Sequence, residues 1–154
     1  MSNAKQTQAA AGSSPGSFDT ARVAGRIAIA SEDDVRRAAI ARALVRDGHR
    51  PATARAALEF FTQAGIAGPD LRHPGRPALV IVDTTGAAWA THDLLEVVCA
   101  APWRLPAIAL VADADAAARA LTLGARAALR LPLDPLLLRA EVMTIVSPAT
   151  RGAA

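Results

Sequence analysis

Residues 77–83 read Pro-Ala-Leu-Val-Ile-Val-Asp, and this stretch decides the fold. The apolar run over residues 78–82 is typical of a strand that is buried on both faces, as the central strands of parallel sheets are. Asp83 follows the run directly. A carboxylate in that position is costly to bury without a partner, so Asp83 is a candidate functional residue.

The chain on either side of this strand alternates between strand and helix patterns. Short apolar runs predict further strands over residues 26–30, 49–52, 106–111 and 127–131. The second of these is weak because Pro51 cannot donate a backbone hydrogen bond. Helical spacing and capping residues predict helices over residues 34–47, 53–63, 91–100, 113–123 and 135–146. Five successive strand–helix units predict an α/β fold, a doubly wound five-stranded parallel sheet with the strand order 2-1-3-4-5.

The two ends of the sequence differ in composition from the middle. Residues 1–24 are rich in Ala, Gln, Ser and Gly and show no periodic apolar face, which predicts a disordered tail. Residues 148–154 are expected to form a second, short tail. One domain over residues 25–147 is left between them.

Charge and cysteine content exclude several classes of protein. The net charge of +3 is a mild excess without a basic stripe, so no nucleic-acid partner is expected. Cys99 is the only cysteine and suits a reducing compartment.

No apolar run approaches the length of a membrane span, which is about 18 residues, and no signal peptide is evident. These observations predict a cytoplasmic protein without a membrane partner. His49, His73 and His92 lack metal-ligand spacing and are expected at the surface.

Acidic residues follow two of the predicted strands. Glu32 and Asp33 come directly after the first strand, and Asp83 ends the third. In a doubly wound sheet these strands are neighbours, so the three carboxylates are expected in one cleft, where they repel one another. A hard divalent cation relieves the repulsion, and Mg²⁺ held by one or two carboxylates and water is the natural ligand.

A structural interpretation competes with this one. Residues 32–34 also lie at the predicted start of a helix, where acidic side chains interact favourably with the helix macrodipole. The position of Asp83 has no comparable structural explanation.

The sequence resembles the receiver domain of two-component response regulators, which has a flavodoxin-like topology. The resemblance extends over about residues 26–146. The matching segments are 26–33 with Arg37 beyond, 77–83, 105–112, 121–125 and 129–134. Their order and spacing together carry the likeness.

The resemblance implies a role in bacterial two-component or phosphorelay signalling rather than an enzymatic one. By this likeness Asp83 is the phosphoacceptor, Glu32 and Asp33 hold Mg²⁺, and the backbone carbonyl of Thr85 is a third ligand. The implied partner is a protein, either a histidine kinase or a downstream regulator.

Three positions depart from the receiver pattern. Receivers usually end the fourth strand with Thr or Ser, have Lys before the Pro that follows the fifth strand, and often have an aromatic residue three positions before that Lys. This sequence has Val111, Leu131 and Ala128 there. The missing Lys would pair directly with phosphoryl charge, and a ligand shifts a conformational equilibrium only through contacts that differ between the two states. We therefore expect an atypical receiver in which Asp83 is phosphorylated poorly or to little effect, and which acts mainly through protein contacts.

Residues 127–146 are the expected contact face. Leu136, Leu137 and Leu138 in succession exceed what one buried helical stripe requires. The excess suggests a surface for a protein partner or for homodimer formation.

Two other functions stay open at the level of sequence. One is a fully functional phospho-accepting response regulator that uses Asp83 without the Lys. The other is an enzyme, because residues 80–86 resemble the aspartyl-phosphate motif of haloacid-dehalogenase-like phosphatases. In that family a Lys and further acids follow the motif, whereas this sequence has no Lys after Lys5, so we expect no enzyme.

Overall fold

A computed structural model describes residues 25–55, 77–86 and 90–146 of the chain. The predicted tails, and most of the helix predicted over residues 53–63, lie outside these residues. Within them, no helix has the length and apolar character that crossing a lipid bilayer would demand.

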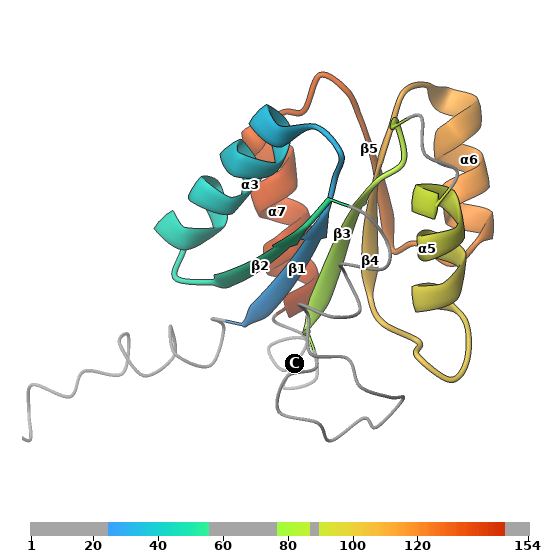
Figure 1. The fold of residues 1–154 in the computed structure, drawn as a ribbon, viewed down its shortest axis with the longest axis horizontal. Helices are drawn as coiled ribbons and strands as arrows, with labels where there is room; N and C mark the ends of the chain where they lie inside the picture. Colours follow the sequence, from blue (N-terminus) through green and yellow to red (C-terminus); the bar gives the residue numbers. More distant parts are fainter. Residues whose placement is uncertain (1–24, 56–76, 87–89, 147–154) are drawn as a thin grey trace, which may run out of the picture.

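The strands form one parallel sheet (Figure 1). They are β1 (Arg26–Ala30), β2 (Arg50–Ala54), β3 (Leu79–Asp83), β4 (Ala107–Val111) and β5 (Ala127–Arg130). Their order is β2-β1-β3-β4-β5, which confirms the predicted doubly wound topology. Ala30 pairs with Val82, so the residues that follow β1 and β3 come together at one edge of the sheet.

The second strand differs from the sequence-based expectation. Thr53, predicted to cap a helix, lies inside β2 opposite Ile29 of β1. Thr is β-branched and fits a strand, and β1 provides a pairing partner for each position of β2. Pro51 is tolerated because β2 is the edge strand of the sheet.

Helices cover both faces of the sheet (Figure 1). They are α3 (Asp34–Arg46), α5 (Ala90–Cys99), α6 (Ala114–Thr122) and α7 (Pro135–Val146). Their bounds agree with the predicted ones to within about one residue at each end. α3 and α7 lie on one face and α5 and α6 on the other.

The hydrophobic core is divided into two layers by the sheet. Leu79 and Ile81 of β3 pack in the layer under α3 and α7, whereas Val80 and Val82 pack in the layer under α5 and α6. All four side chains are fully buried. Burying each contributes about 1.5–3 kcal/mol, which explains why this strand is a continuous apolar run rather than an alternating one.

The end of α3 corrects a second expectation. Gly48 adopts φ +86°, a left-handed conformation that a side chain would oppose, and turns the chain into β2. His49, expected at the surface, is only 3% exposed. The turn brings it beside the start of β1, where the Gly25 N–H donates a hydrogen bond to its Nδ1 over 3.3 Å.

Candidate functional site

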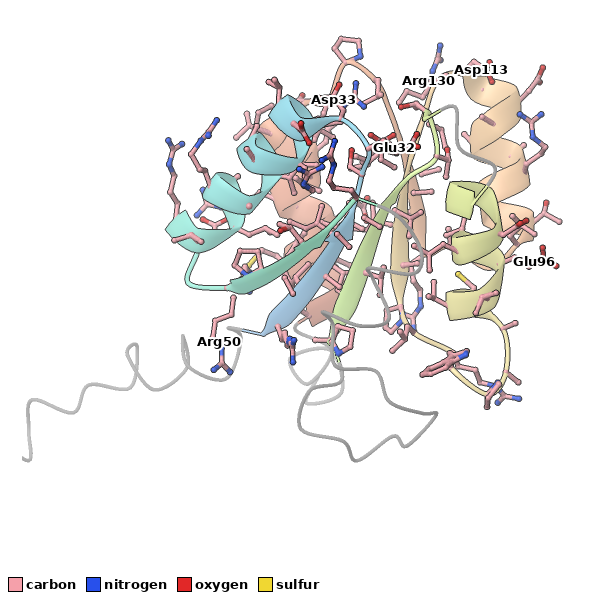
Figure 2. All side chains as sticks on the ribbon, viewed as in Figure 1. Glu32, Asp33, Arg50, Glu96, Asp113 and Arg130 are labelled. Carbon is pink, nitrogen blue, oxygen red and sulfur yellow. The ribbon has the colours of Figure 1, made fainter. Side chains whose placement is uncertain are left out.

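The loops after β1 and β3 border a shallow pocket at the carboxyl edge of the sheet. Its lining residues are Glu32, Asp33, Arg36, Asp83, Thr85 and Gly86. Figure 2 shows Glu32 and Asp33 at this edge, with Asp33 at the start of α3. The structure thus brings together the three predicted carboxylates and Thr85.

The Asp83 carboxylate is held by hydrogen bonds on both oxygens. Oδ2 accepts from the Ser31 hydroxyl at 2.7 Å and from Arg36 Nη1 at 2.6 Å. Oδ1 accepts from the Thr85 amide at 3.0 Å and from the Thr85 hydroxyl at 2.6 Å. With Asp83 only 2% exposed, the protein supplies the donors that water would otherwise provide.

These contacts decide the protonation state of Asp83. Burial by itself would raise its pKa, since a carboxylate loses its hydration inside the protein. The hydrogen bonds from Thr85, Ser31 and Arg36 outweigh burial and hold the pKa of Asp83 below its ordinary value. Asp83 is therefore an anion near neutral pH.

Arg36 links the pocket to the first turn of α3. It is the third residue of that helix. Helical side chains tilt toward the N-terminus, which directs this guanidinium toward the strand ends. Nη1 contacts Asp83 and also donates to the Thr85 hydroxyl at 3.2 Å, and Nη2 lies 3.5 Å from Asp33 Oδ2.

Asp33 and Glu32 have different positions in the pocket. Asp33 caps α3, because its Oδ1 accepts from the Arg36 amide at 2.9 Å. This is the helix-terminus role that the sequence offered as an alternative. The Glu32 carboxylate lies beside Gly86, where an added Cβ would collide with it.

The carboxylate oxygens of Asp83 are not available as ligands for a magnesium ion while Arg36 stays in place. Mg²⁺ needs carboxylate oxygens that are free to coordinate, and both oxygens of Asp83 are already engaged by protein donors. Over the part of the chain that the structure describes, no group of three or more His, Cys, Asp and Glu side chains is arranged to hold a metal ion. The ligand roles of Glu32, Asp33 and the Thr85 carbonyl remain predictions.

No protein-family model matches the sequence, and no curated protein matches it. Solved structures do match. A candidate response regulator from Chloroflexus aurantiacus superposes with a TM-score of 0.68 at 23% identity, over 80% of this chain and 98% of its own. The receiver domain of a signal transduction histidine kinase from Syntrophus aciditrophicus superposes with a TM-score of 0.67 at 21% identity, over 83% of this chain and 94% of its own. A CheY-like receiver domain protein from Methanospirillum hungatei superposes with a TM-score of 0.68 at 18% identity, over 84% of this chain and 98% of its own.

The chain has the receiver fold. In this fold the pocket lies where the strand order reverses, between β1 and β3, which is where open parallel sheets bind their ligands. The location of the candidate site therefore follows from topology as well as from its residues.

The three residues that depart from the receiver pattern all pack against the hydrophobic core, and Ala128 and Leu131 stay partly exposed. Val111 is fully buried under α5 and α6, and Ala128 packs against the same layer. Leu131 packs against the layer under α3 and α7. The hydroxyl of Thr84, at the end of β3, donates to the Leu110 carbonyl at 2.8 Å and so ties β3 to β4 rather than facing a ligand.

Two residues of the site were missed by sequence reasoning. Ser31 lies between β1 and the acidic pair and donates to Asp83, and Arg36 supplies the cation. Arg36 was detectable in principle, since it lies three residues after Asp33 and so shares its helix face.

Proposed function

We propose that this chain is an atypical receiver module that signals mainly through protein–protein contacts, with Asp83 as its candidate phosphoacceptor. The observation that supports this most strongly is the ion pair between Arg36 and Asp83, together with the hydrogen bonds from Ser31 and Thr85. A carboxylate must be free to attack phosphorus, whereas these contacts stabilise its ground state. The free-energy barrier to phosphorylation therefore rises by the amount by which these contacts stabilise the unphosphorylated carboxylate.

The surroundings of Asp83 also offer little to a transferred phosphoryl group. Catalysis of phosphoryl transfer depends on cations and donors that are positioned for the developing charge. Val111 and Leu131 supply hydrocarbon in place of the hydroxyl and ammonium groups expected of receivers. The one cation seen in the pocket, among the described residues, is already paired with Asp83 and Asp33.

The contact surface proposed for partners lies on α7. Leu136 and Leu137 are 74% and 56% exposed, and Met143 is exposed near the end of the same helix. Exposed apolar residues that gather on one element are typical of protein interaction sites. A histidine kinase, a downstream regulator or a second copy of the chain would bind there.

Phosphorylation by acetyl phosphate tests the proposal. The wild-type chain is incubated with acetyl phosphate and Mg²⁺, and intact mass spectrometry measures the phosphorylated fraction, with Asp83→Asn as the control. We expect a small fraction or none in the wild type. A nearly complete adduct that disappears in Asp83→Asn, and that changes the amide NMR spectrum beyond the pocket, would establish a fully functional receiver instead.

The phosphatase alternative is not favoured by the comparisons, in which solved receiver domains match the fold over more than four fifths of this chain. We expect no turnover of an aryl phosphate by this chain. Turnover that Asp83→Asn abolishes would restore the enzymatic interpretation.

A further inference from the structure

We propose that Arg36 is a resident counter-ion, whose guanidinium takes the place of a divalent cation among the carboxylates of the pocket and keeps Mg²⁺ out. Removal of this side chain is then expected to turn the pocket into a magnesium site. This role goes beyond the proposed function, because it concerns the charge balance of the pocket and does not depend on phosphoryl transfer.

The contacts of Arg36 are those of a bridging cation. Nη1 lies 2.6 Å from Asp83 Oδ2, and Nη2 lies 3.5 Å from Asp33 Oδ2. One guanidinium thus contacts carboxylates from two different loops, the one after β1 and the one after β3. Bridging of this kind is what a metal ion does for clustered carboxylates, whose mutual repulsion must be offset by positive charge.

The position of Arg36 in the helix supports a specific role. A cation in the first turn is opposed by the positive end of the helix macrodipole, and the carboxylates beside Arg36 offset this cost. Arg37, the next residue, turns elsewhere: its Nη1 donates to the Ser31 carbonyl at 2.7 Å, and its Nη2 pairs with Asp34 at 2.6 Å. Arg37 thus fastens the loop to the helix, while Arg36 neutralises the pocket.

Arg36 and a divalent cation compete for the same oxygens. Asp83 Oδ2 already accepts hydrogen bonds from Arg36 and Ser31, and like charges a few ångströms apart repel strongly at protein dielectric constants. Without Arg36, the carboxylates of Asp33 and Asp83 lose the guanidinium that bridges them. Mg²⁺ is commonly bound in proteins through only one or two carboxylates, with water completing its coordination.

Magnesium binding to Arg36→Ala tests this role directly. Isothermal titration calorimetry with MgCl₂ on the full chain measures affinity, and line broadening of the Thr85 and Gly86 amide signals by Mn²⁺ locates the ion. We expect Arg36→Ala to bind one ion per chain at least about tenfold more tightly than the wild type, because one positive charge has been removed from the pocket. Arg36→Gln is the second neutral variant if Arg36→Ala does not fold.

Two further variants decide what the result means. Arg36→Ala/Asp83→Asn is expected to lose the gained site. Arg42→Ala, which removes one exposed charge from the same helix, is expected to bind Mg²⁺ as weakly as the wild type. The role of Arg36 is overturned if the neutral variants bind no more tightly than the wild type, or if the gain survives loss of the Asp83 charge. Neither result depends on whether Asp83 accepts phosphate, so failure here is distinct from failure of the proposed function.

Discussion

The Asp83 carboxylate is nearly inaccessible to solvent, yet the groups around it keep it ionised. Its pKa is lower in the folded chain than in the unfolded one, where about 3.9 is usual. The stability that this difference contributes is present above the unfolded pKa and is lost as the pH falls through the folded pKa.

Asp83→Asn is therefore expected to lower the free energy of unfolding at pH 7 by about 1–3 kcal/mol, since charge-assisted hydrogen bonds are lost. It is also expected to lose less stability than the wild type on acidification below about pH 4. Urea unfolding at pH 7 and in the acid range measures both, with the exposed Glu96→Gln as the control. Equal acid sensitivity in the wild type and Asp83→Asn would contradict the ion pair.

His49 is expected to produce a second pH dependence at milder acidity. Its burial lowers its pKa, more than nearby Asp47 raises it, so the folded chain holds the imidazole neutral below the usual value of about 6.5. As the pH falls, the unfolded chain therefore binds this proton before the folded chain does. The stability that neutral His49 contributes is fully present above about pH 6.5 and is lost as the pH falls from there through the lower pKa of the folded chain.

His49→Gln removes this titration. The free energy of unfolding of the variant is expected to change less between pH 7 and pH 5 than that of the wild type. Denaturant unfolding at several pH values measures the slope. Identical slopes for the two proteins would show that His49 is accessible to water, contrary to the structure.

The sequence located the anions of the site better than the groups that hold them. Asp83 was detectable because an acid after a long apolar run has few structural explanations. Ser31 and Arg36 were harder to identify, since serine and arginine near a helix start are common. The spacing of Arg36 from Asp33 indicates a shared helix face, but only the folded chain shows that both residues reach Asp83. His49 was misjudged because its burial depends on the turn at Gly48, not on its own residue type.

At the scale of the element, the residue that precedes α3 has two roles. Asp33 caps the helix through the Arg36 amide and pairs with the Arg36 side chain. Asp33→Ala is expected to lower the free energy of unfolding by about 1 kcal/mol, and Asp33→Ser, which keeps the cap, by only a few tenths. Thermal or urea unfolding compares them.

Asp113→Ala, which removes the corresponding cap of α6 far along the chain, is the matched control and is expected to cost a similar amount. Equal destabilisation by Asp33→Ala and Asp33→Ser would show that the cap is unimportant and that the charge of Asp33 matters instead.

The helices were predictable because their ends carry strong local signals. Asp33 and Asp113 cap their helices through backbone amides, and Pro135 occupies the first position of α7, where its missing N–H does no harm. β2 was harder, because an edge strand with a proline has weak local preferences and is fixed by its pairing with β1.

At the scale of the whole molecule, the three successive leucines of α7 divide between its exposed surface and the hydrophobic core. Leu136 and Leu137 are exposed, whereas Leu138 is 2% exposed and belongs to the core. Leu136→Glu/Leu137→Glu is expected to change stability by no more than about 0.5 kcal/mol for each residue and to abolish any self-association that the wild type shows through this face. Analytical ultracentrifugation measures the oligomeric state.

Leu138→Ala is the control for core damage and is expected to cost about 2–5 kcal/mol. A homodimer contact through α7 is refuted if the wild type self-associates and the glutamate variants associate equally well.

The topology was the most predictable property, since alternating strands and helices leave few arrangements of a parallel sheet. The charge balance of the pocket was not predictable, because it depends on side chains from separate segments that only the folded sheet brings together.

The central claim is that Arg36 and Ser31 occupy the Asp83 carboxylate and so prevent a metal ion and a phosphoryl group from binding to it. An amide NMR titration of the wild-type chain with Mg²⁺ and beryllofluoride tests this claim most directly. We predict that the Thr85 and Gly86 signals, and those at the end of β4, stay where they are. Stoichiometric shifts that begin at Asp83 and spread into β4 and β5 would contradict the account.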